Sequence, residues 1–215
     1  MTPYQTAIDV LPRGSAIQLY NVTWDEYEKL LEELDERPYL RLTYDQGYLH
    51  IMTISAEHDG FTRLFGYLML VLAEELGFKY LSRGSTTLNN QRNASGAEAD
   101  DCFYFSHLAE IGKKKRLDLS VDPPPDLVVE VDITHPSVHK FPIYARLRIP
   151  EIWWFDGQDM KFYRLENDFY EEVSLSPRFP FIAATDLPEF LWQGKSEDIS
   201  DMARAFRDWV KAHQS

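Results

Sequence analysis

Two acidic residues of this chain lie in apolar segments, where an unpaired charge is unfavourable. Asp100 directly precedes the apolar run Asp101–Phe105, and Glu130 lies within the run Asp126–Ile133. Both runs are typical of buried strands in an α/β sheet, where a charged side chain needs a partner. Carboxylate oxygens are ligands of hard divalent cations such as Mg²⁺. With Lys140 nearby in the sequence, the two acids predict a site where a cation and a lysine act on a phosphodiester.

The alternation of side chains along a strand places Glu130 and Asp132 on one face. With Asp100 on an adjacent strand, three carboxylates would converge. We expect Asp100, Glu130 and the backbone carbonyl of Val131 to hold the cation and to leave positions for water and a phosphate oxygen. Lys140 would position that water or offset charge on the phosphate. The spacing alone leaves an alternative open, because acids at strand ends are often solvated or paired with a nearby basic residue.

Composition indicates one packed domain over residues 1–215. The chain has 215 residues, of which 44% are hydrophobic and 14% aromatic, so a single hydrophobic core is expected. No apolar run approaches the roughly 18 residues of a membrane span, and residues 1–4 show no start of a signal peptide. The single cysteine, Cys102, excludes an intramolecular disulfide and fits a reducing compartment. We therefore expect a cytoplasmic protein without a membrane partner.

The net charge of −13 argues against nucleic-acid binding, because a DNA-binding protein usually carries a basic face. A local exception is the basic run Lys113–Arg116. This run is either a solvated loop or a focused positive patch on an otherwise acidic molecule. The sequence leaves both interpretations open.

Hydrophobic periodicity predicts alternating helices and strands. Thr23 and Glu26 form a capping box for a helix that should end near residue 37, and a second helix should run from the N-cap Ser55 to Gly77. Residues 1–15 are expected to be irregular and residues 89–97 to form a polar loop. Further helices are expected before Leu147 and over residues 196–213. Strands are expected at 39–44, 48–54, 78–82, 85–88, 101–105, 126–133, 152–155, 160–165 and 169–173.

Five segments in a fixed order carry a family resemblance: Asp45–Met52, Gly96–Tyr104, Pro125–Val131, Lys140–Tyr144 and Ile149–Trp153. In their order and spacing they resemble the Uma2 family of proposed endonucleases, formerly a domain of unknown function. The resemblance covers roughly residues 20–190. That family belongs to the restriction-endonuclease-like PD-(D/E)XK superfamily. The resemblance implies a mixed α/β fold, with a central mixed sheet flanked by helices and an added C-terminal helix.

The resemblance also implies roles for individual residues. Asp100 matches the aspartate of the family's Pro-Asp pair, and Glu130 matches the acid of its second motif. Asp132 stands where the superfamily usually has its lysine. In the Uma2 pattern a lysine lies further on, four residues before a tyrosine, and Lys140 before Tyr144 matches that position.

Three further residues are candidates for contacts around the metal ligands. His58 matches a histidine that is common in the family. The neighbouring Glu57 is either a further ligand or an acid that complements the dipole of the helix it begins. Asp132, which lies on the same face of the predicted strand as Glu130, is the third candidate. Cys102 is expected to be a small buried hydrophobic residue rather than a catalytic thiol.

The function that these expectations favour is Mg²⁺-dependent (or Mn²⁺-dependent) hydrolysis of phosphodiester bonds in DNA, catalysed by Asp100, Glu130 and Lys140. A homodimer is expected, because two sites related by a two-fold axis cut both strands of a duplex most simply. The main alternative is a catalytically inactive nuclease fold that binds nucleic acid or protein, which Asp132 and the acidic net charge favour. A Mg²⁺ enzyme acting on a small phosphate compound is a third class.

Overall fold

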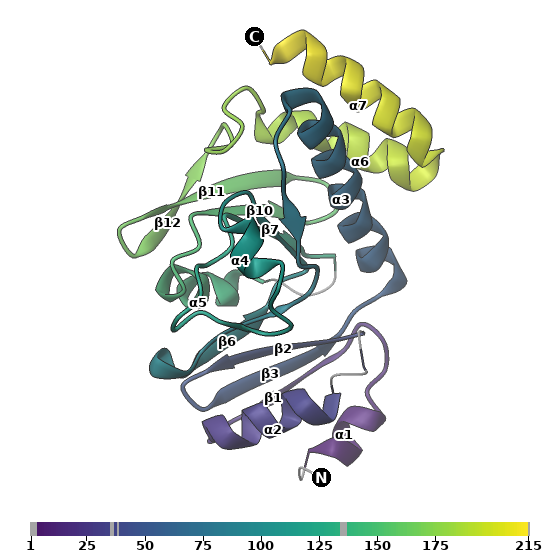
Figure 1. The fold of residues 1–215 in the computed structure, drawn as a ribbon. Coiled ribbons are helices and arrows are strands. Elements are labelled where there is room, and N and C mark those ends of the chain that lie inside the picture. Colours follow the sequence, from purple (N-terminus) through teal and green to yellow (C-terminus); the bar gives the residue numbers. More distant parts are fainter. Residues whose placement is uncertain (1–3, 35–36, 38, 134–136, 215) are drawn as a thin grey trace.

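Two six-stranded mixed sheets form the framework of the protein, and α-helices cover both of them (Figure 1). The computed structural model describes residues 4–34, 37, 39–133 and 137–214. The expected mixed α/β class, with flanking helices and a helix at the C-terminus, is confirmed. The strands, however, divide between two sheets, and the short segment Ala99–Asp100 leads from the first sheet to the second.

The first sheet has the order β1-β3-β2-β6-β5-β8, in which only the β5–β8 pair is parallel. Its strands are β1 (Ala16–Leu19), β2 (Leu40–Asp45), β3 (Tyr48–Thr53), β5 (Thr87–Asn90), β6 (Ser95–Glu98) and β8 (Leu117–Asp118). The second sheet has the order β12-β11-β10-β9-β7-β4, in which only β9 and β10 are parallel. Its strands are β4 (Leu81–Ser82), β7 (Asp101–Tyr104), β9 (Leu127–Val131), β10 (Glu151–Phe155), β11 (Met160–Glu166) and β12 (Phe169–Val173).

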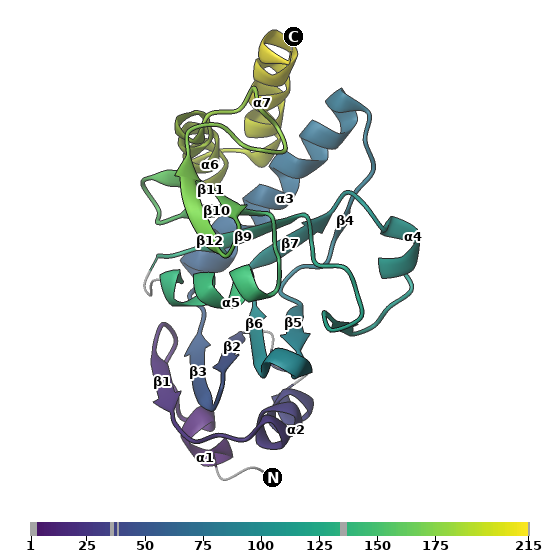
Figure 2. The same cartoon turned by 90° about the vertical axis from the view of Figure 1, so that its left-hand side faces the viewer.

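Helices form layers on both sides of the second sheet. Apolar residues of α3 (Ala56–Leu76), α6 (Leu187–Ser196) and α7 (Ile199–His213) share one core cluster with the face of β9 that carries Leu127, Val129 and Val131. The opposite face packs against α5 (Phe141–Arg146), which lies between the two sheets (Figure 2). The first sheet is covered by α1 (Gln5–Asp9) and α2 (Trp24–Leu34). The remaining short elements are α4 (Leu108–Ile111) and the 3₁₀ turns η1 (Gln91–Asn93), η2 (Val138–Lys140) and η3 (Ala184–Asp186).

Local signals for the first two long helices are confirmed. The backbone N–H of Thr23 donates to the Glu26 carboxylate at 2.8 Å, and the Glu26 N–H donates back to Thr23 Oγ1 at 3.3 Å. Ser55 caps α3 through the N–H of His58, and Gly77 ends it in the left-handed conformation, with φ at 69°. The predicted end of the first helix falls partly on residues 35 and 36, which lie outside the described residues.

Other elements differ from the sequence predictions. Residues 95–97, expected in a polar loop, belong to strand β6 (Ser95–Glu98). The strand was missed because close packing requires small residues there, and small residues do not signal a strand. A Cβ at Gly96 would come within 2.2 Å of Asn89 Oδ1 and 2.5 Å of the Tyr27 hydroxyl. The prediction that residues 1–15 are irregular is wrong for Gln5–Asp9, which form helix α1. Strand β1 and helix α6 were also not predicted, and the closing helix begins at Ile199 rather than at residue 196. None of the described helices is long and apolar enough to cross a membrane.

One buried carboxylate ties β10 to the loop that follows β12. Glu151 accepts hydrogen bonds from Trp153 Nε1 at 2.7 Å, Ser176 Oγ at 2.6 Å and the Arg178 N–H at 3.0 Å. Burial raises the pKa of Glu151, and these donors partly offset that effect. The carboxylate is therefore a structural acid with its own set of donors.

Glu151→Ala is expected to lower the free energy of unfolding by about 2–4 kcal/mol, because it leaves buried donors without an acceptor. Urea denaturation at neutral pH measures the change. Glu171→Ala, at an exposed acid on the edge strand β12, serves as control and should change stability by less than about 0.5 kcal/mol. Equal effects of the two substitutions would contradict the structural role of Glu151.

Candidate functional site

The chain crosses from one sheet to the other at Asp100, which is 2% exposed. Its Oδ2 accepts a hydrogen bond from the backbone N–H of Val131, the last residue of β9, at 2.8 Å. The side chains of Cys102 and Tyr104 pack in the same core cluster as Val128. Because strand side chains alternate, Asp100 and Glu130 thus lie on the face of the second sheet that α5 covers.

Two side chains bind the Glu130 carboxylate: that of Lys140, just before α5, and that of Tyr144, within α5. Its Oε2 lies 2.8 Å from Lys140 Nζ, and both side chains are only 1% exposed. Its Oε1 accepts a hydrogen bond from the Tyr144 hydroxyl. Lys140 also donates to the backbone carbonyl of Glu98, at 3.0 Å. The lysine therefore reaches into the same buried cluster as the two acids.

Two basic side chains flank Asp100. His58 comes from the first turn of α3, and its Nε2 lies 3.0 Å from Asp100 Oδ2. Arg41 comes from β2, and its Nε lies 3.6 Å from Asp100 Oδ1. Glu57, by contrast, is exposed at the start of α3, and its backbone carbonyl faces Lys195 at 3.5 Å.

Asp132 is bound to partners of its own. Its Oδ2 accepts hydrogen bonds from the backbone N–H of Ser137 at 2.6 Å, from the Ser137 hydroxyl at 3.1 Å and from Trp154 Nε1. Within the part of the chain that the structure describes, no group of three or more His, Cys, Asp or Glu side chains is arranged to hold a metal ion. The carboxylates available to a metal are therefore two, and Asp132 stays near the pair as a further negative charge.

The two acids have opposite protonation behaviour. Burial alone would raise the pKa of Asp100, but its neighbours His58, Lys140 and Arg41 together outweigh burial and lower the pKa to about 2. For Glu130 burial dominates and raises the pKa to about 8, with Lys140 offsetting it only in part. Asp100 is thus a permanent carboxylate, while Glu130 exchanges its proton near neutral pH.

Lys140 stays charged although it is buried. Burial would lower its pKa, but the surrounding carboxylates outweigh burial and raise it; they are Glu130, Asp100 and Asp132. Burial also raises the pKa of the Tyr144 phenol, as does the adjacent Glu130. Lys140 and Tyr144 therefore act as hydrogen-bond donors to Glu130 at neutral pH.

The donor set fits a hard cation. Asp100 Oδ1 is buried and has no hydrogen-bond partner among the described residues, but it faces Arg41 Nε at 3.6 Å, so a cation there must share the oxygen with Arg41 or displace it. The N–H and C=O of one strand residue point to the same side, so the carbonyl of Val131 faces the same side as its N–H, which is bonded to Asp100. Both oxygens of Glu130 are engaged, by Lys140 and Tyr144, and one of these contacts must open before Glu130 binds a cation. The three expected ligands are oxygens, as Mg²⁺ and Mn²⁺ prefer.

Three site neighbours were not assigned roles from the sequence. Tyr144 lies four residues after Lys140, and that helical spacing alone could have placed both on one face. Arg41 alternates with Leu40 and Leu42, a pattern that indicates a solvent-facing position, so the sequence carries no signal of its burial in β2. Glu98 precedes Asp100 by two residues, and its carboxylate accepts hydrogen bonds from the Leu42 N–H and the Thr87 hydroxyl, both at 3.0 Å.

Comparison with known proteins assigns the family. The profile of the Uma2 family, described as "Putative restriction endonuclease", matches residues 24–193. The chain belongs to the Uma2 family. Among solved structures, the fold is similar to a "putative nuclease belonging to DUF820" from Anabaena variabilis ATCC 29413, with a TM-score of 0.55 and 14% identity, over 79% of this chain and 99% of that one. No curated protein matches the sequence. The Uma2 assignment made from the sequence motifs is confirmed, and the structural similarity supports the fold.

The raised pKa of Glu130 predicts a pH-dependent stability. Its carboxyl has a pKa of 4.5 in the unfolded chain and about 8 in the folded one. Between these values the folded state holds more protons, so stability falls as pH rises, by up to about 1.4 kcal/mol per pH unit. Glu130→Gln removes this titration. The unfolding free energy of the parent, measured in urea, should therefore fall relative to that of Glu130→Gln as pH rises through this window.

The exposed Glu171→Gln provides the matched control, whose curve should run parallel to that of the parent. A constant difference between the parent and Glu130→Gln across the window would show that Glu130 titrates normally.

Proposed function

We propose that this Uma2 protein is a metal-dependent nuclease that hydrolyses phosphodiester bonds in DNA. The observation that carries the proposal is the convergence of Asp100, Glu130 and Lys140 in one buried cluster. Membership of a family described as "Putative restriction endonuclease" supports it, as does the similarity of the fold to the Anabaena protein described as a "putative nuclease". As an accompanying proposal, the active form is a cytoplasmic homodimer whose two sites cut the two strands.

The cation would be Mg²⁺ or Mn²⁺, held by the Asp100 and Glu130 carboxylates and the carbonyl of Val131. When bound, it would offset the negative charge that develops on the phosphate during hydrolysis. Asp100 is ionised at neutral pH and is oriented by the Val131 N–H and by His58. It is therefore ready to bind a cation without losing a proton.

Lys140 is the group that would act on the substrate itself. Its ammonium is held between the Glu130 carboxylate and the Glu98 carbonyl, and a third proton remains for a phosphate oxygen or a water. Tyr144 keeps Glu130 in place when the lysine turns toward the phosphate. Arg41, near Asp100, adds positive charge on the side where an anionic substrate would lie.

One observation favours the alternative of a nuclease fold that binds without cutting. Both oxygens of Glu130 already have donors, so the buried cluster satisfies itself without a metal. If those donors hold the carboxylate permanently, the protein keeps the cleft of a nuclease without its activity. The two functions differ in the effect of Glu130 on DNA cleavage.

The test is nicking of supercoiled plasmid with Mg²⁺ or Mn²⁺. Glu130→Gln should reduce the nicking rate at least about 100-fold, because it removes a metal ligand while keeping side-chain size. Glu130→Ala and Lys140→Met should have a similar effect, and EDTA should abolish nicking by the parent. Thermal melting of each variant verifies that the fold is retained.

Glu171→Gln, at the exposed acid on β12, should nick at the parental rate. If the parent and Glu130→Gln both bind DNA and neither of them nicks it, the result would support the binding module instead. Nicking that survives in Glu130→Gln and in EDTA would contradict the site.

A further inference from the structure

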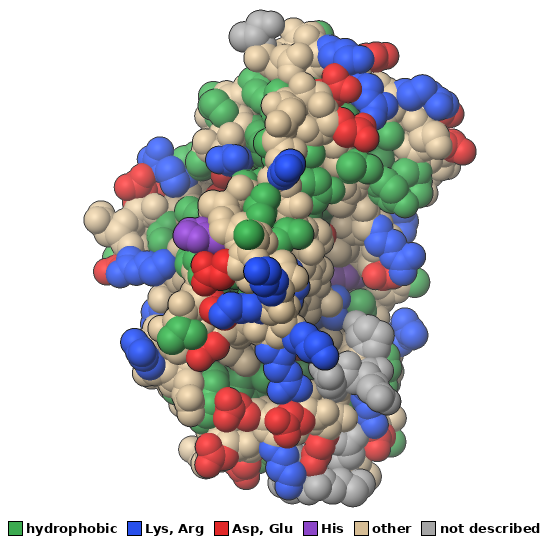
Figure 3. All heavy atoms as spheres, viewed as in Figure 1, with side chains coloured by type: hydrophobic (Ala, Val, Ile, Leu, Met, Phe, Trp, Pro, Cys, Tyr) green, Lys and Arg blue, Asp and Glu red, His purple; other side chains and the backbone are tan. Residues whose placement is uncertain are grey.

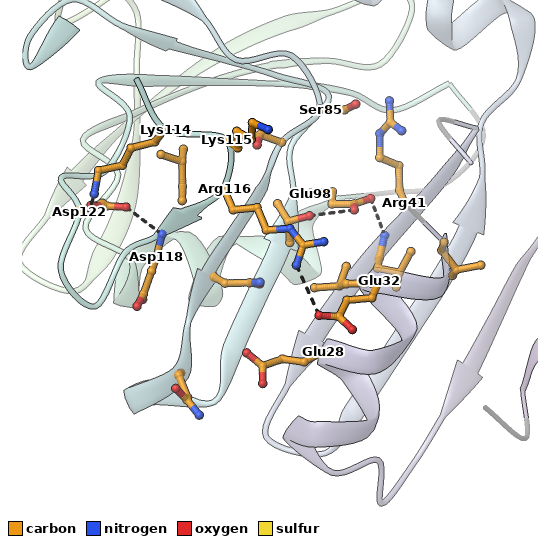
Figure 4. Close-up of a pocket in the computed structure, with 18 of the residues that line it drawn as sticks. Glu28, Glu32, Arg41, Ser85, Glu98, Lys114, Lys115, Arg116, Asp118 and Asp122 are labelled. Atoms are coloured by element: carbon orange, nitrogen blue, oxygen red, sulfur yellow. Dashed lines mark hydrogen bonds and ion pairs between the residues drawn. The ribbon is translucent and has the colours of Figure 1, made fainter. Parts of the chain in front are cut away.

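A cavity of about 670 Å³ opens beside the candidate site, between α2 and the segment Lys114–Asp118 (Figure 4). Its volume falls in the range of pockets that enclose one small ligand, about 300–1,000 Å³. A duplex is too large for such a space, but one or two nucleotides of a single strand are not. The cavity therefore has a size that selects for an unpaired strand.

Two lining residues of the cavity also contact the buried cluster, while Asp100, Glu130 and Lys140 themselves do not line the cavity. Arg41 lines it, and the Arg41 guanidinium lies 3.6 Å from Asp100 Oδ1. Glu98 lines it too, and the backbone carbonyl of Glu98 accepts a hydrogen bond from Lys140. Figure 4 shows Arg41 and Glu98 together at one side of the cavity. A ligand in the cavity would thus be separated from the candidate metal site by Arg41 and Glu98.

Two parts of the cavity lining, a basic wall and an acidic wall, carry opposite charges. Lys114, Lys115 and Arg116 come from one segment, and Glu28 and Glu32 face them from α2 (Figure 4). The rest of the lining is mixed, with Asp118 and Asp122 on the segment that follows the basic residues and Arg37 and Arg41 on the chain that follows α2. On the face drawn in Figure 3, acidic side chains likewise gather near α2, at the bottom of the view, while basic ones lie above. A nucleotide has the same polarity, with an anionic phosphate at one side and base N–H donors at the other.

The basic wall has a fixed backbone. Arg83 donates to the carbonyl of Lys114 at 2.8 Å, and the N–H of Leu119 donates to the carbonyl of Asn89 at 2.7 Å. The Lys114 side chain is paired with Asp122. These contacts join the segment to Arg83, after β4, and to Asn89 in β5, and they fix the backbone on either side of Lys115 and Arg116.

Only a weak contact closes the mouth of the cavity. Arg116 Nη1 lies 3.8 Å from Glu32 Oε1, and both side chains are 67% exposed, so solvent screens the pair. A phosphate can replace Glu32 as the partner of Arg116. The strand β5 side of the cavity adds amide and hydroxyl groups that can bond to base edges, including those of Asn89, Thr86 and Thr87.

We propose that this cavity binds one or two unpaired nucleotides of a DNA strand, separated from the candidate metal site by Arg41 and Glu98. Lys115 and Arg116 hold the phosphates, and the bases point toward α2 and β5. The inference rests on the proposed nuclease function and specifies its substrate as single-stranded or locally unpaired DNA. Enzymes that take a base out of the stack pay a few kcal/mol unless the strand is already unpaired.

The test is fluorescence anisotropy with a labelled oligonucleotide, as a single strand and as a duplex, in EDTA so that nothing is cut. The single strand should bind more tightly than the duplex. Lys115→Ala and Arg116→Ala should each weaken single-strand binding severalfold and should reduce the salt dependence by about 0.7 counterions per lost phosphate contact. Lys113→Ala, in the same basic run but outside the cavity lining, should change affinity less than twofold.

A second pair of variants tests the acidic wall. Glu32→Gln should strengthen binding, because it removes the competitor for Arg116. Asp25→Asn, an exposed acid of α2 outside the cavity lining, changes the net charge equally and should have less effect. The parent protein should bind an oligonucleotide about tenfold more weakly when the base that would occupy the cavity is replaced by an abasic position.

Equal losses in Lys113→Ala and Lys115→Ala, or equal affinity for duplex and single strand, would overturn the cavity proposal. If plasmid nicking nevertheless depends on Glu130, the nuclease function stands and only the cavity assignment fails. Absence of both binding and nicking by the parent would overturn both.

Discussion

The contact between Glu130 and Lys140, which is an ion pair whenever Glu130 is ionised, is the interaction on which the site depends. Both side chains are 1% exposed, and burying two charges costs several kcal/mol per ion unless geometry and further hydrogen bonds offset it. The Tyr144 hydroxyl and the Glu98 carbonyl supply those bonds and thereby fix α5 over β9. Well-packed apolar residues would give a fold of similar or greater stability. The pair is therefore easier to explain by chemistry than by stability, and this agrees with the nuclease proposal.

The division of the strands into two sheets places Asp100 next to the pair of Glu130 and Lys140. Asp100 lies where the chain leaves β6 for β7, so it faces groups from both sheets: Arg41 on one side and the Val131 N–H on the other. The same junction brings Glu98 to the wall of the cavity and its carbonyl to Lys140. The proposed metal site and the proposed nucleotide cavity thus lie on two sides of the segment where the chain crosses between the sheets. A change in the packing of the sheets would disturb both.

Much of this arrangement could be predicted from local patterns. Helix α3 has a cap, a long apolar period and a terminal glycine, and Glu130 is conspicuous as a charge within a run of valines. Strand β6 could not be predicted, because close packing against Tyr27 and Asn89 requires small residues that carry no strand signal. The contact of Arg41 with Asp100 joins residues far apart in the sequence, and only the topology of two sheets brings them together. Asp132 was expected on the metal side, but Ser137 and Trp154 bind its carboxylate.

The central claim is that Asp100 and Glu130 form one cation site. Anomalous diffraction from a crystal soaked in Mn²⁺ tests it most directly. The account predicts a single peak within coordination distance of Asp100 Oδ1, a Glu130 oxygen and the Val131 carbonyl, with Lys140 or Tyr144 displaced from Glu130. A structure in which Mn²⁺ is absent from this position, while the contacts of Lys140 and Tyr144 with Glu130 stay intact, would contradict it.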